Sequence, residues 1–384
     1  MKKTEQLSRS IFLFVAVGLL FLSCTQNQAV NPLEQALASA DGRIKRVMDS
    51  LDQYELQIRY TQIGRFGDSI VFTDYDFQVD ENAYFYPAST VKFPAAVAAL
   101  EKLNEIDSLD RDTRFYVEGD SVETTFSEAI LQIFTVSDNV ANNRLVEFLG
   151  FDDLNGRMRR RGVKPIRIAH RLSTDNADGV TTKPLVIYLN DSTTATTKPI
   201  ASGAPRPLEL MEIKKGTGFY VQDSLHRGTF DFGLKNYYPI TAQHALLKRI
   251  VFPDQFIGEE RFNLSESQRG FLLDAMQLLP QEVGYDSEEY YDSYGKFFIY
   301  GDKKEAMPDH VSIYNKVGYA YGTLTDCAYI HDEKNKVEFM VTATILVNKD
   351  GIFNDNVYEY DEVGIPFLAQ LGRELYHYEL NRKR

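Results

Sequence analysis

Hydrophobic positions near the start of the chain first follow helical spacing and then alternate as they do in β-strands. Apolar side chains recur every three or four residues across 32–51, which predicts an amphipathic helix. Two short runs rich in Tyr, Ile, Val and Phe follow at 54–60 and 69–75, and Gly64 and Gly67 lie between them. This order predicts a helix followed by a β-hairpin.

The next part of the chain is mainly helical in pattern. The Ala-rich run 89–100 is apolar at almost every position, which predicts a buried helix. Residues 101–123 are charged and loop-like, and a second apolar run follows at 126–134. Helical spacing returns at 140–149, and Gly150 is placed to end that helix.

Residues 172–240 lose the helical pattern and consist of short apolar runs separated by turns rich in Thr, Pro and Gly. Four of these runs are predicted as short strands: 185–189, 208–213, 218–221 and 228–233. We interpret 172–240 as a β-rich insertion.

Regular patterns return in the last third of the chain. The predicted elements are helices at 241–251 and 265–279, strands at 315–329 and 336–347, and a closing helix at 365–380. Strand-rich segments at both ends with helices between them predict an α+β fold. We expect an antiparallel sheet built from both chain ends and flanked by helices, plus a helical lobe over about 89–260 that includes the insertion.

The N-terminal segment has the pattern of a targeting signal. Lys2, Lys3 and Arg9 precede an apolar run at 11–22, which is short for a membrane span. The run ends in Leu-Ser-Cys24, which resembles a bacterial lipoprotein box. The resemblance implies removal of residues 1–23, lipidation of Cys24, a tether over 24–31, and a catalytic domain over 32–384. The expected location is the periplasmic side of the cell envelope, and the alternative is an ordinary secretory signal with an incidental cysteine.

Composition excludes several classes of function. The formal net charge is −13, and no basic stripe offsets it, so we expect no nucleic-acid partner. The six histidines show no metal-binding spacing, and we predict neither a metal nor another cofactor. Once the signal is removed, Cys327 would be the only free thiol, which leaves no internal disulfide. The oligomeric state stays open.

One short motif offers nucleophilic chemistry. Ser89 opens the Ala-rich helix and Lys92 follows three residues later, so on a helix the hydroxyl and the amine share one face. The helix N-terminus adds free N–H groups and partial positive charge, which suit acyl transfer. By itself, however, this spacing favours a capped helix with a solvated lysine.

Two further motifs change that interpretation. Ser137-Asp138-Asn139 and Lys316-Val-Gly follow in order, although alone they would indicate a helix N-cap and a bend in a strand. The three motifs together resemble the signature of class A β-lactamases and penicillin-binding proteins. The resemblance covers most of residues 35–170 and 241–384, and it excludes the insertion.

The resemblance implies a catalytic role for four of the matched residues. Ser89 would be the acylated nucleophile, and Lys92 would take its proton directly or through water. Ser137 would pass a proton to the leaving nitrogen, and Lys316 would tune the potential around Ser137 and attract a substrate carboxylate. Asp138 would have a structural role by bonding nearby backbone.

The resemblance also implies a set of substrate-binding groups. Asn139 would hydrogen-bond both Lys92 and a substrate amide. Gly318 and Tyr319 would line the substrate site, and the backbone N–H groups of Ser89 and Tyr319 would form an oxyanion hole.

The sequence departs from the family pattern in three places. Val317 replaces a hydroxyl residue, and no Arg follows on the adjoining strand at 324–326. The Glu-x-x-x-Asn loop that activates the deacylating water in class A enzymes is missing, and 170–178 stands in its place. Asp175 or His170 could substitute for this Glu, and the alternative is that both are structural.

Three hypotheses follow. The first is a serine hydrolase of the β-lactamase-like class that cleaves an amide such as a β-lactam ring. The second is a penicillin-binding peptidase-like enzyme whose acyl-enzyme is released slowly. The third is a non-catalytic lipoprotein that uses the same fold to bind a partner. The partners expected are a small-molecule or peptide amide and, through the lipid alone, a membrane.

Overall fold

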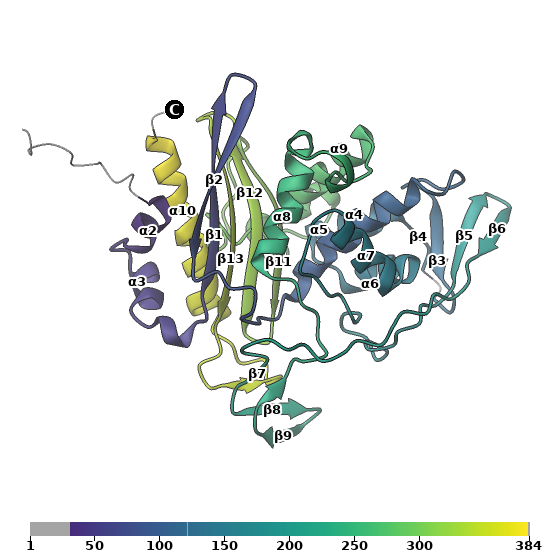
Figure 1. The fold of residues 1–384 in the computed structure, drawn as a ribbon, viewed down its shortest axis with the longest axis horizontal. Helices are drawn as coiled ribbons and strands as arrows, with labels where there is room; N and C mark the ends of the chain where they lie inside the picture. Colours follow the sequence, from purple (N-terminus) through teal and green to yellow (C-terminus); the bar gives the residue numbers. More distant parts are fainter. Residues whose placement is uncertain (1–30, 121, 383–384) are drawn as a thin grey trace, which may run out of the picture.

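A five-stranded antiparallel sheet forms the centre of the computed structural model, which describes residues 31–120 and 122–382 (Figure 1). The sheet order is β11-β12-β13-β1-β2. Its strands are β1 (Gln57–Phe66), β2 (Ser69–Phe77), β11 (Val311–Ala320), β12 (Thr323–Asp332) and β13 (Val337–Leu346). Because β1 pairs with β13, the sheet is built from both chain ends, as predicted. The predicted signal segment, Cys24 and all of the tether except Asn31 lie outside the described residues.

The two hairpins of the sheet correct the predicted strand limits. Gly64 lies within β1 opposite Val71, so only Gly67, with φ of +59°, belongs to the first turn. The single strand predicted at 315–329 is two strands, which turn at Tyr321 and Gly322 with φ of +54° and +74°. Left-handed φ at both central residues suits a tight hairpin turn, but Tyr is an uncommon residue there, so the sequence signal was weak.

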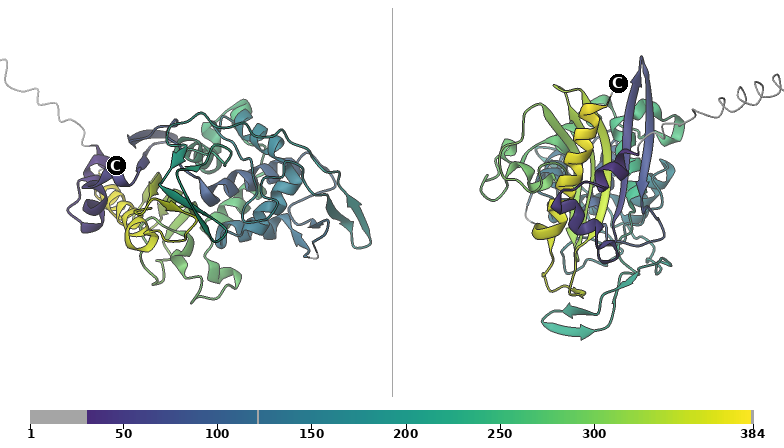
Figure 2. Two further views of the ribbon diagram at one scale, coloured as in Figure 1. Left: turned by 90° about the horizontal axis from the view of Figure 1, so that it is seen from below. Right: turned by 90° about the vertical axis from the view of Figure 1, so that its left-hand side faces the viewer.

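Helices from the two chain ends cover one face of the sheet. They are α2 (Pro32–Leu37), α3 (Gly42–Met48) and α10 (Ile365–Asn381), and Figure 2 (right) shows them lying over the strands. Residues 32–51 therefore do not form the one helix predicted, because Asp41 caps a second start by accepting from the Arg43 N–H. The apolar faces of these helices join the inner sheet residues in one buried cluster.

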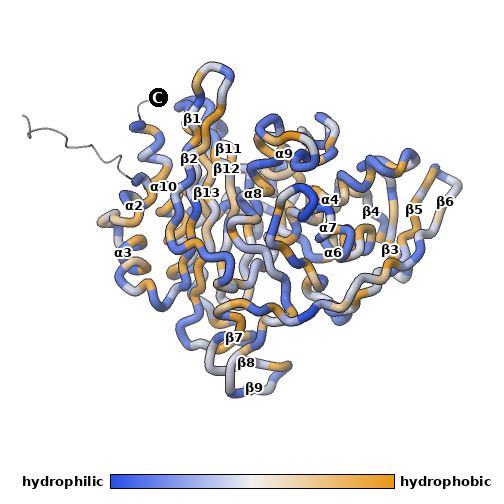
Figure 3. Tube along the Cα trace, viewed as in Figure 1, coloured by the Kyte–Doolittle hydropathy of each residue, from blue (hydrophilic) through white to orange (hydrophobic). Residues whose placement is uncertain are grey.

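The opposite face of the sheet carries α8 and a lobe of helices. These helices are α4 (Lys92–Leu103), α5 (Phe126–Thr135), α6 (Asn139–Leu149), α7 (Phe151–Arg160), α8 (Ile240–Val251) and α9 (Glu266–Gln277). Alanines dominate α4 and let its neighbours pack closely, so nearly all of the helix is buried. Gly150 ends α6 with φ of +71°, as predicted. Figure 3 shows hydrophobic residues gathered along the strands and the helices that face them.

The predicted insertion contributes to three small sheets. One has the order β4-β3-β5-β6, another pairs β10 with β7, and the third has the order β14-β8-β9. Their strands are β3 (Arg114–Val117), β4 (Thr124–Thr125), β5 (Leu185–Asn190), β6 (Thr193–Thr196), β7 (Lys214–Lys215), β8 (Gly218–Val221), β9 (Ser224–Arg227), β10 (Phe230–Asp231) and β14 (Ile352–Phe353).

Two predictions around the insertion were wrong in detail. Residues 208–213 form no strand and make only an isolated bridge between Met211 and Ala83. Residues 101–123 are not all loop, because α4 runs to Leu103 and β3 pairs with β5 of the insertion. Within residues 31–120 and 122–382, no helix has both the length and the apolar character needed to cross a membrane.

Candidate active site

Ser89 and Lys92 lie at the start of the buried helix α4. Ser89 belongs to a short 3₁₀ turn, η2 (Ala88–Val91), which leads directly into α4, and Lys92 is the first residue of α4. Ser89 is half-buried, whereas Lys92 is fully buried. In the described part of the chain, Ser89 Oγ has no hydrogen-bond partner. The hydroxyl lines a pocket and is therefore available to a substrate.

The three motifs meet at Ser137, in the loop between α5 and α6. Lys92 Nζ donates to the Ser137 carbonyl and, at 3.2 Å, to Ser137 Oγ. Lys316 Nζ donates to the same Oγ at 2.9 Å and to the Val317 carbonyl at 2.8 Å. Ser137 holds this position with φ of +57°, a backbone strain that is typical of functional sites in non-glycine residues. Lys92, Ser137 and Lys316 are thus brought together, and Ser89 lies three residues before Lys92 with no hydrogen bond to any of them in the described part of the chain.

Gly318 brings strand β11 against the turn that carries Ser89. A Cβ atom at Gly318 would lie 2.8 Å from the Ser89 backbone nitrogen and 2.8 Å from the Pro87 carbonyl oxygen. Only glycine permits this approach without displacing backbone. The next residue, Tyr319, is 49% exposed and lines the same pocket as Ser89. The backbone around Ser89 and Tyr319 therefore converges where the sequence predicted an oxyanion hole.

Burial shifts the pKa of both lysines. Burial lowers the pKa of Lys92 to about 7 from its ordinary 10.5, while the negative charge of Asp138 acts in the opposite direction. Burial also lowers the pKa of Lys316, and the charge of Lys92 lowers it further. Two amines within reach of one hydroxyl disfavour simultaneous protonation. Lys92 can therefore be neutral near pH 7, as a base must be.

A second buried network lies behind Lys316, and no sequence motif indicated it. Lys296 Nζ donates to the Met276 carbonyl at 2.6 Å, the Ile313 carbonyl at 3.0 Å and Asn315 Oδ1 at 2.8 Å. Asn315 Nδ2 in turn donates to Asp326 Oδ1 at 2.9 Å. Asp326 belongs to the stretch 324–326, in which the sequence lacks the expected Arg. Its side chain is a buried partner of this network. Burial raises its pKa to about 6, and the hydrogen bond from Asn315 opposes that change.

The hydrogen bonds of Asn139 differ from the prediction, whereas those of Asp138 agree with it. Asn139 does not hydrogen-bond Lys92 as predicted, because its Nδ2 donates to Ser173 Oγ at 3.0 Å. Asp138 is structural as predicted, because its Oδ1 accepts from the Ala141 N–H at 2.7 Å and caps α6.

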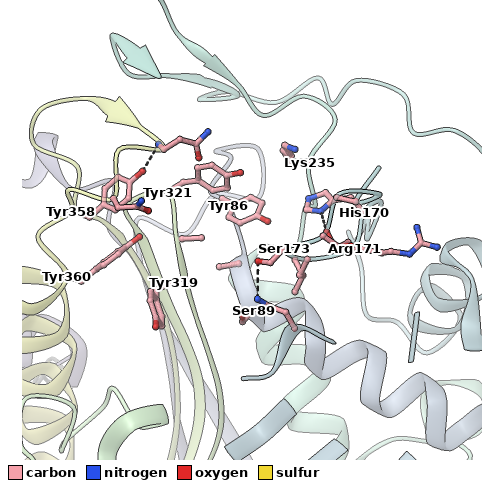
Figure 4. A pocket seen from close by; sticks show the side chains of 18 residues that line it. Tyr86, Ser89, His170, Arg171, Ser173, Lys235, Tyr319, Tyr321, Tyr358 and Tyr360 are labelled. Carbon is pink, nitrogen blue, oxygen red and sulfur yellow. Dashed lines mark hydrogen bonds between the residues drawn. The ribbon is translucent and has the colours of Figure 1, made fainter. Parts of the chain in front are cut away.

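A pocket of about 580 Å³ opens above Ser89 (Figure 4). Its walls come from β11, from the segment after α7, from the insertion and from the loop before α10. Five tyrosines line it: Tyr86, Tyr319, Tyr321, Tyr358 and Tyr360. No Asp or Glu is among its lining residues. Across the described residues, no cluster of His, Cys, Asp or Glu could hold a metal ion.

Of the two substitutes named for the missing Glu, only His170 lines the pocket. Its Nδ1 lies 2.6 Å from the Arg171 carbonyl oxygen, which can only accept, so Nδ1 carries the proton. Nε2 is buried with no hydrogen-bond partner in the described part of the chain. Burial lowers the pKa of His170 and favours the neutral ring. Asp175 is exposed and does not line the pocket.

The insertion builds part of the pocket wall, which the sequence did not predict. Phe232 of the insertion packs on Tyr84, Tyr86, Tyr321 and Phe353, with ring centroids 5.4–6.0 Å apart. Strand β14 also pairs in parallel with β8. The insertion therefore fixes the positions of tyrosines beside Ser89. Its clustered aromatic residues at 219, 230 and 232 were the available signal.

Comparisons with known proteins support this fold. Residues 40–199 match the model of a β-lactamase enzyme family, Beta-lactamase2. A search of curated proteins finds no match to this chain.

Solved structures of β-lactamases align with most of the chain. A class A β-lactamase from Bacteroides cellulosilyticus aligns with a TM-score of 0.53 and 14% identity, covering 90% of this chain and 96% of its own. A β-lactamase from Sphaerobacter thermophilus aligns with a TM-score of 0.48 and 13% identity, covering 89% and 94%. One from Xanthomonas campestris aligns with a TM-score of 0.49 and 15% identity, covering 84% and 91%.

At 14% identity, the similarity to the Bacteroides cellulosilyticus enzyme shows the fold, and the match to the family model is limited to residues 40–199. The mixed α and β architecture with its antiparallel sheet is that of class A β-lactamases. Over residues 40–199 the chain matches a β-lactamase enzyme family, and its fold is that of class A β-lactamases.

Proposed function

We propose that this protein is acylated on Ser89 by an amide such as a β-lactam ring and then hydrolyses the acyl-enzyme. The observation that carries the proposal is that Lys92 and Lys316 both donate to Ser137 Oγ, while Ser89, three residues before Lys92, lines a pocket together with Asn139. A capped helix with a solvated lysine would not bury Lys92 completely. Nor would it gather a second buried lysine at the same hydroxyl.

The first step follows from these positions. Ser89 Oγ attacks the amide carbonyl carbon, and its proton passes to neutral Lys92 Nζ. The carbonyl oxygen gains negative charge, which the N–H groups of Ser89 and Tyr319 stabilise; one such donor is typically worth about 10²–10³ in rate. The C–N bond then breaks as the Ser137 hydroxyl protonates the leaving nitrogen. Ser137 regains a proton from the Lys92 ammonium, so both groups return to their starting state.

The second step requires a water that attacks the Ser89 ester and releases a carboxylic acid. Class A enzymes use a Glu for this, and no carboxylate lines the pocket here. That observation favours a second candidate function, a peptidase-like enzyme whose acyl-enzyme with β-lactams persists. The two candidates share the acylation step and differ in the lifetime of the ester.

Intact mass over time after mixing with benzylpenicillin tests both. The expected result is an adduct of the whole penicillin mass that Ser89→Ala abolishes. Ser69→Ala, at an exposed position in the β1–β2 hairpin, is the matched control and should acylate normally. A transient adduct supports the hydrolase and a lasting one supports the peptidase-like enzyme. The absence of an adduct with several β-lactams would refute acylation by such rings.

We further propose that the mature chain begins at Cys24 and carries a lipid there, which would place it at the cell envelope. Support comes from the charged start, the short apolar run and the small residue before Cys24. Cys24→Ser should leave the protein unlipidated, as judged by incorporation of labelled fatty acid in a bacterial host.

A further inference from the structure

Lys235 stands out among the residues that line the pocket, because it is a cation without a counter-ion. It lies in the insertion, it is half-buried, and its side chain forms no ion pair or hydrogen bond within the described residues. Its backbone is fixed, since its N–H donates to the Phe232 carbonyl at 2.8 Å and its carbonyl accepts from Arg167. Lys235 therefore starts from a fixed point on the pocket wall.

The rest of the pocket leaves this charge unbalanced. The chain carries 55 Asp and Glu residues and a net charge of −13, yet none of them is among the lining residues. Arg171, the other lining cation, is neutralised by Glu147 through contacts of 2.6 and 2.9 Å. Asp178 raises the pKa of Tyr86 and Tyr321 secondarily to their burial, but it forms no ion pair with Lys235 in this structure. An anion would thus find one cation free to bind it.

The surroundings of Lys235 suit a group that is apolar beside its charge. Burial raises the pKa of Tyr86, Tyr321, Tyr358 and Tyr360, so their hydroxyls stay protonated at neutral pH and can donate. Tyr86 and Tyr321 pack edge to face with ring centroids 4.9 Å apart. Their faces offer apolar contact, while Asn354 and Asn356 add amide groups at the rim.

The position of Lys235 in the pocket indicates which half of the substrate it faces. Figure 4 shows Lys235 and His170 on the side of the pocket opposite Tyr319 and Tyr360, with Ser89 below. Ser173, which belongs to the same wall, accepts a hydrogen bond from Asn139. The family resemblance implies that Asn139 hydrogen-bonds a substrate amide, which we assign to the acyl side chain, and in the proposed function Ser137 protonates the leaving half. The wall that carries Lys235 therefore faces the acyl half.

We propose that Lys235 binds a carboxylate on the acyl side chain of the substrate, so that the preferred substrates are amides with an anionic and partly apolar acyl group. This inference rests on the proposed function for the orientation of the substrate. It assigns the insertion a role in specificity, because the insertion supplies both the cation and the support for the tyrosines.

Binding of two penicillins tests the inference without requiring turnover. Benzylpenicillin and carbenicillin differ by one carboxylate on the acyl side chain. In Ser89→Ala protein, which cannot acylate, calorimetry should show carbenicillin binding about tenfold more tightly than benzylpenicillin, as one charge-assisted hydrogen bond allows. Adding Lys235→Ala should abolish the difference, and Lys235→Arg should retain most of it. The matched control is Lys214→Ala, which removes an exposed insertion lysine outside the pocket.

Each outcome decides the inference separately from acylation. Equal affinities in Ser89→Ala protein, no measurable binding of either penicillin, or a preference that survives Lys235→Ala would each overturn it. Acylation of otherwise unchanged protein is followed in parallel by intact mass. An adduct at Ser89 without carbenicillin preference refutes the role of Lys235 alone. A preference without any adduct refutes the acylation step and leaves the carboxylate site standing.

Discussion

The burial of Lys92 makes acylation dependent on pH in a way that can be measured. A base must be neutral to accept the Ser89 proton, and the pKa of Lys92 is lowered to about 7 by burial. Below that pH, Lys92 is an ammonium and cannot act. We expect the acylation rate to rise about tenfold per pH unit below 7 and to level off above it.

The size of the effect follows from the change in pKa. A lysine with the ordinary pKa of 10.5 would be neutral in about one molecule in 3,000 at pH 7, whereas Lys92 is neutral in about half. The shift corresponds to a free energy on the order of 5 kcal/mol, which burial imposes on the charged form. An unburied lysine in the same place would acylate about a thousandfold more slowly at neutral pH.

The assay is the initial rate of adduct formation with benzylpenicillin by rapid-quench intact mass between pH 5 and 9. Asp138→Asn tests the electrostatic origin of this pH dependence. Asn keeps the cap of α6 but removes the negative charge that stabilises the Lys92 ammonium. The acid limb should move to lower pH in this variant. A rate that is constant from pH 5 to 8, a rate that still rises tenfold per pH unit up to pH 9, or an unmoved limb in Asp138→Asn would refute the assignment of Lys92 as the base.

Two further predictions concern release of the acyl group and the approach of β11. His170→Gln should change the acylation rate by no more than about twofold. It should lengthen the life of the Ser89 adduct about 10²-fold or more, because the free Nε2 lone pair that could activate the deacylating water is lost. An unchanged adduct lifetime would exclude His170 as the base for deacylation. Gly318→Ala should slow acylation about 10²-fold, since its Cβ would push on the Ser89 nitrogen, and normal rates with an unchanged melting temperature would contradict that geometry.

The local structure around the three motifs could be predicted because it depends on short stretches of chain. Ser89 and Lys92 are three residues apart, and the N–H group that donates to Asp138 also lies three residues on. The sheet built from both ends was also predictable, because alternating strands at each end have no other partner. The fold class and most helices followed from such local patterns.

Features that depend on contacts between distant segments could not be predicted. Lys296 looked like any lysine in the sequence, and only packing places it 2.8 Å from Asn315 Oδ1. The hydrogen bond of Asn139 went to Ser173, because the loop that carries Ser173 departs from the family pattern. The position of Lys235 in the pocket wall likewise could not be predicted, because it depends on the packing of Phe232 of the insertion against Tyr86.

The buried lysines also explain why the site lies between the two large apolar clusters of the fold. Lys92, Lys296 and Lys316 are all within a few per cent of complete burial, and each has a lowered pKa. For Lys92 and Lys296 the folded pKa of about 7 lies below the ordinary 10.5, so between these values the unfolded chain binds more protons and stability rises with pH. Near neutral pH the site therefore costs stability. Two large apolar clusters, one on each side of the sheet, offset that cost. A site built on a loose loop would be hydrated, its lysines would be charged, and Ser89 would have no base.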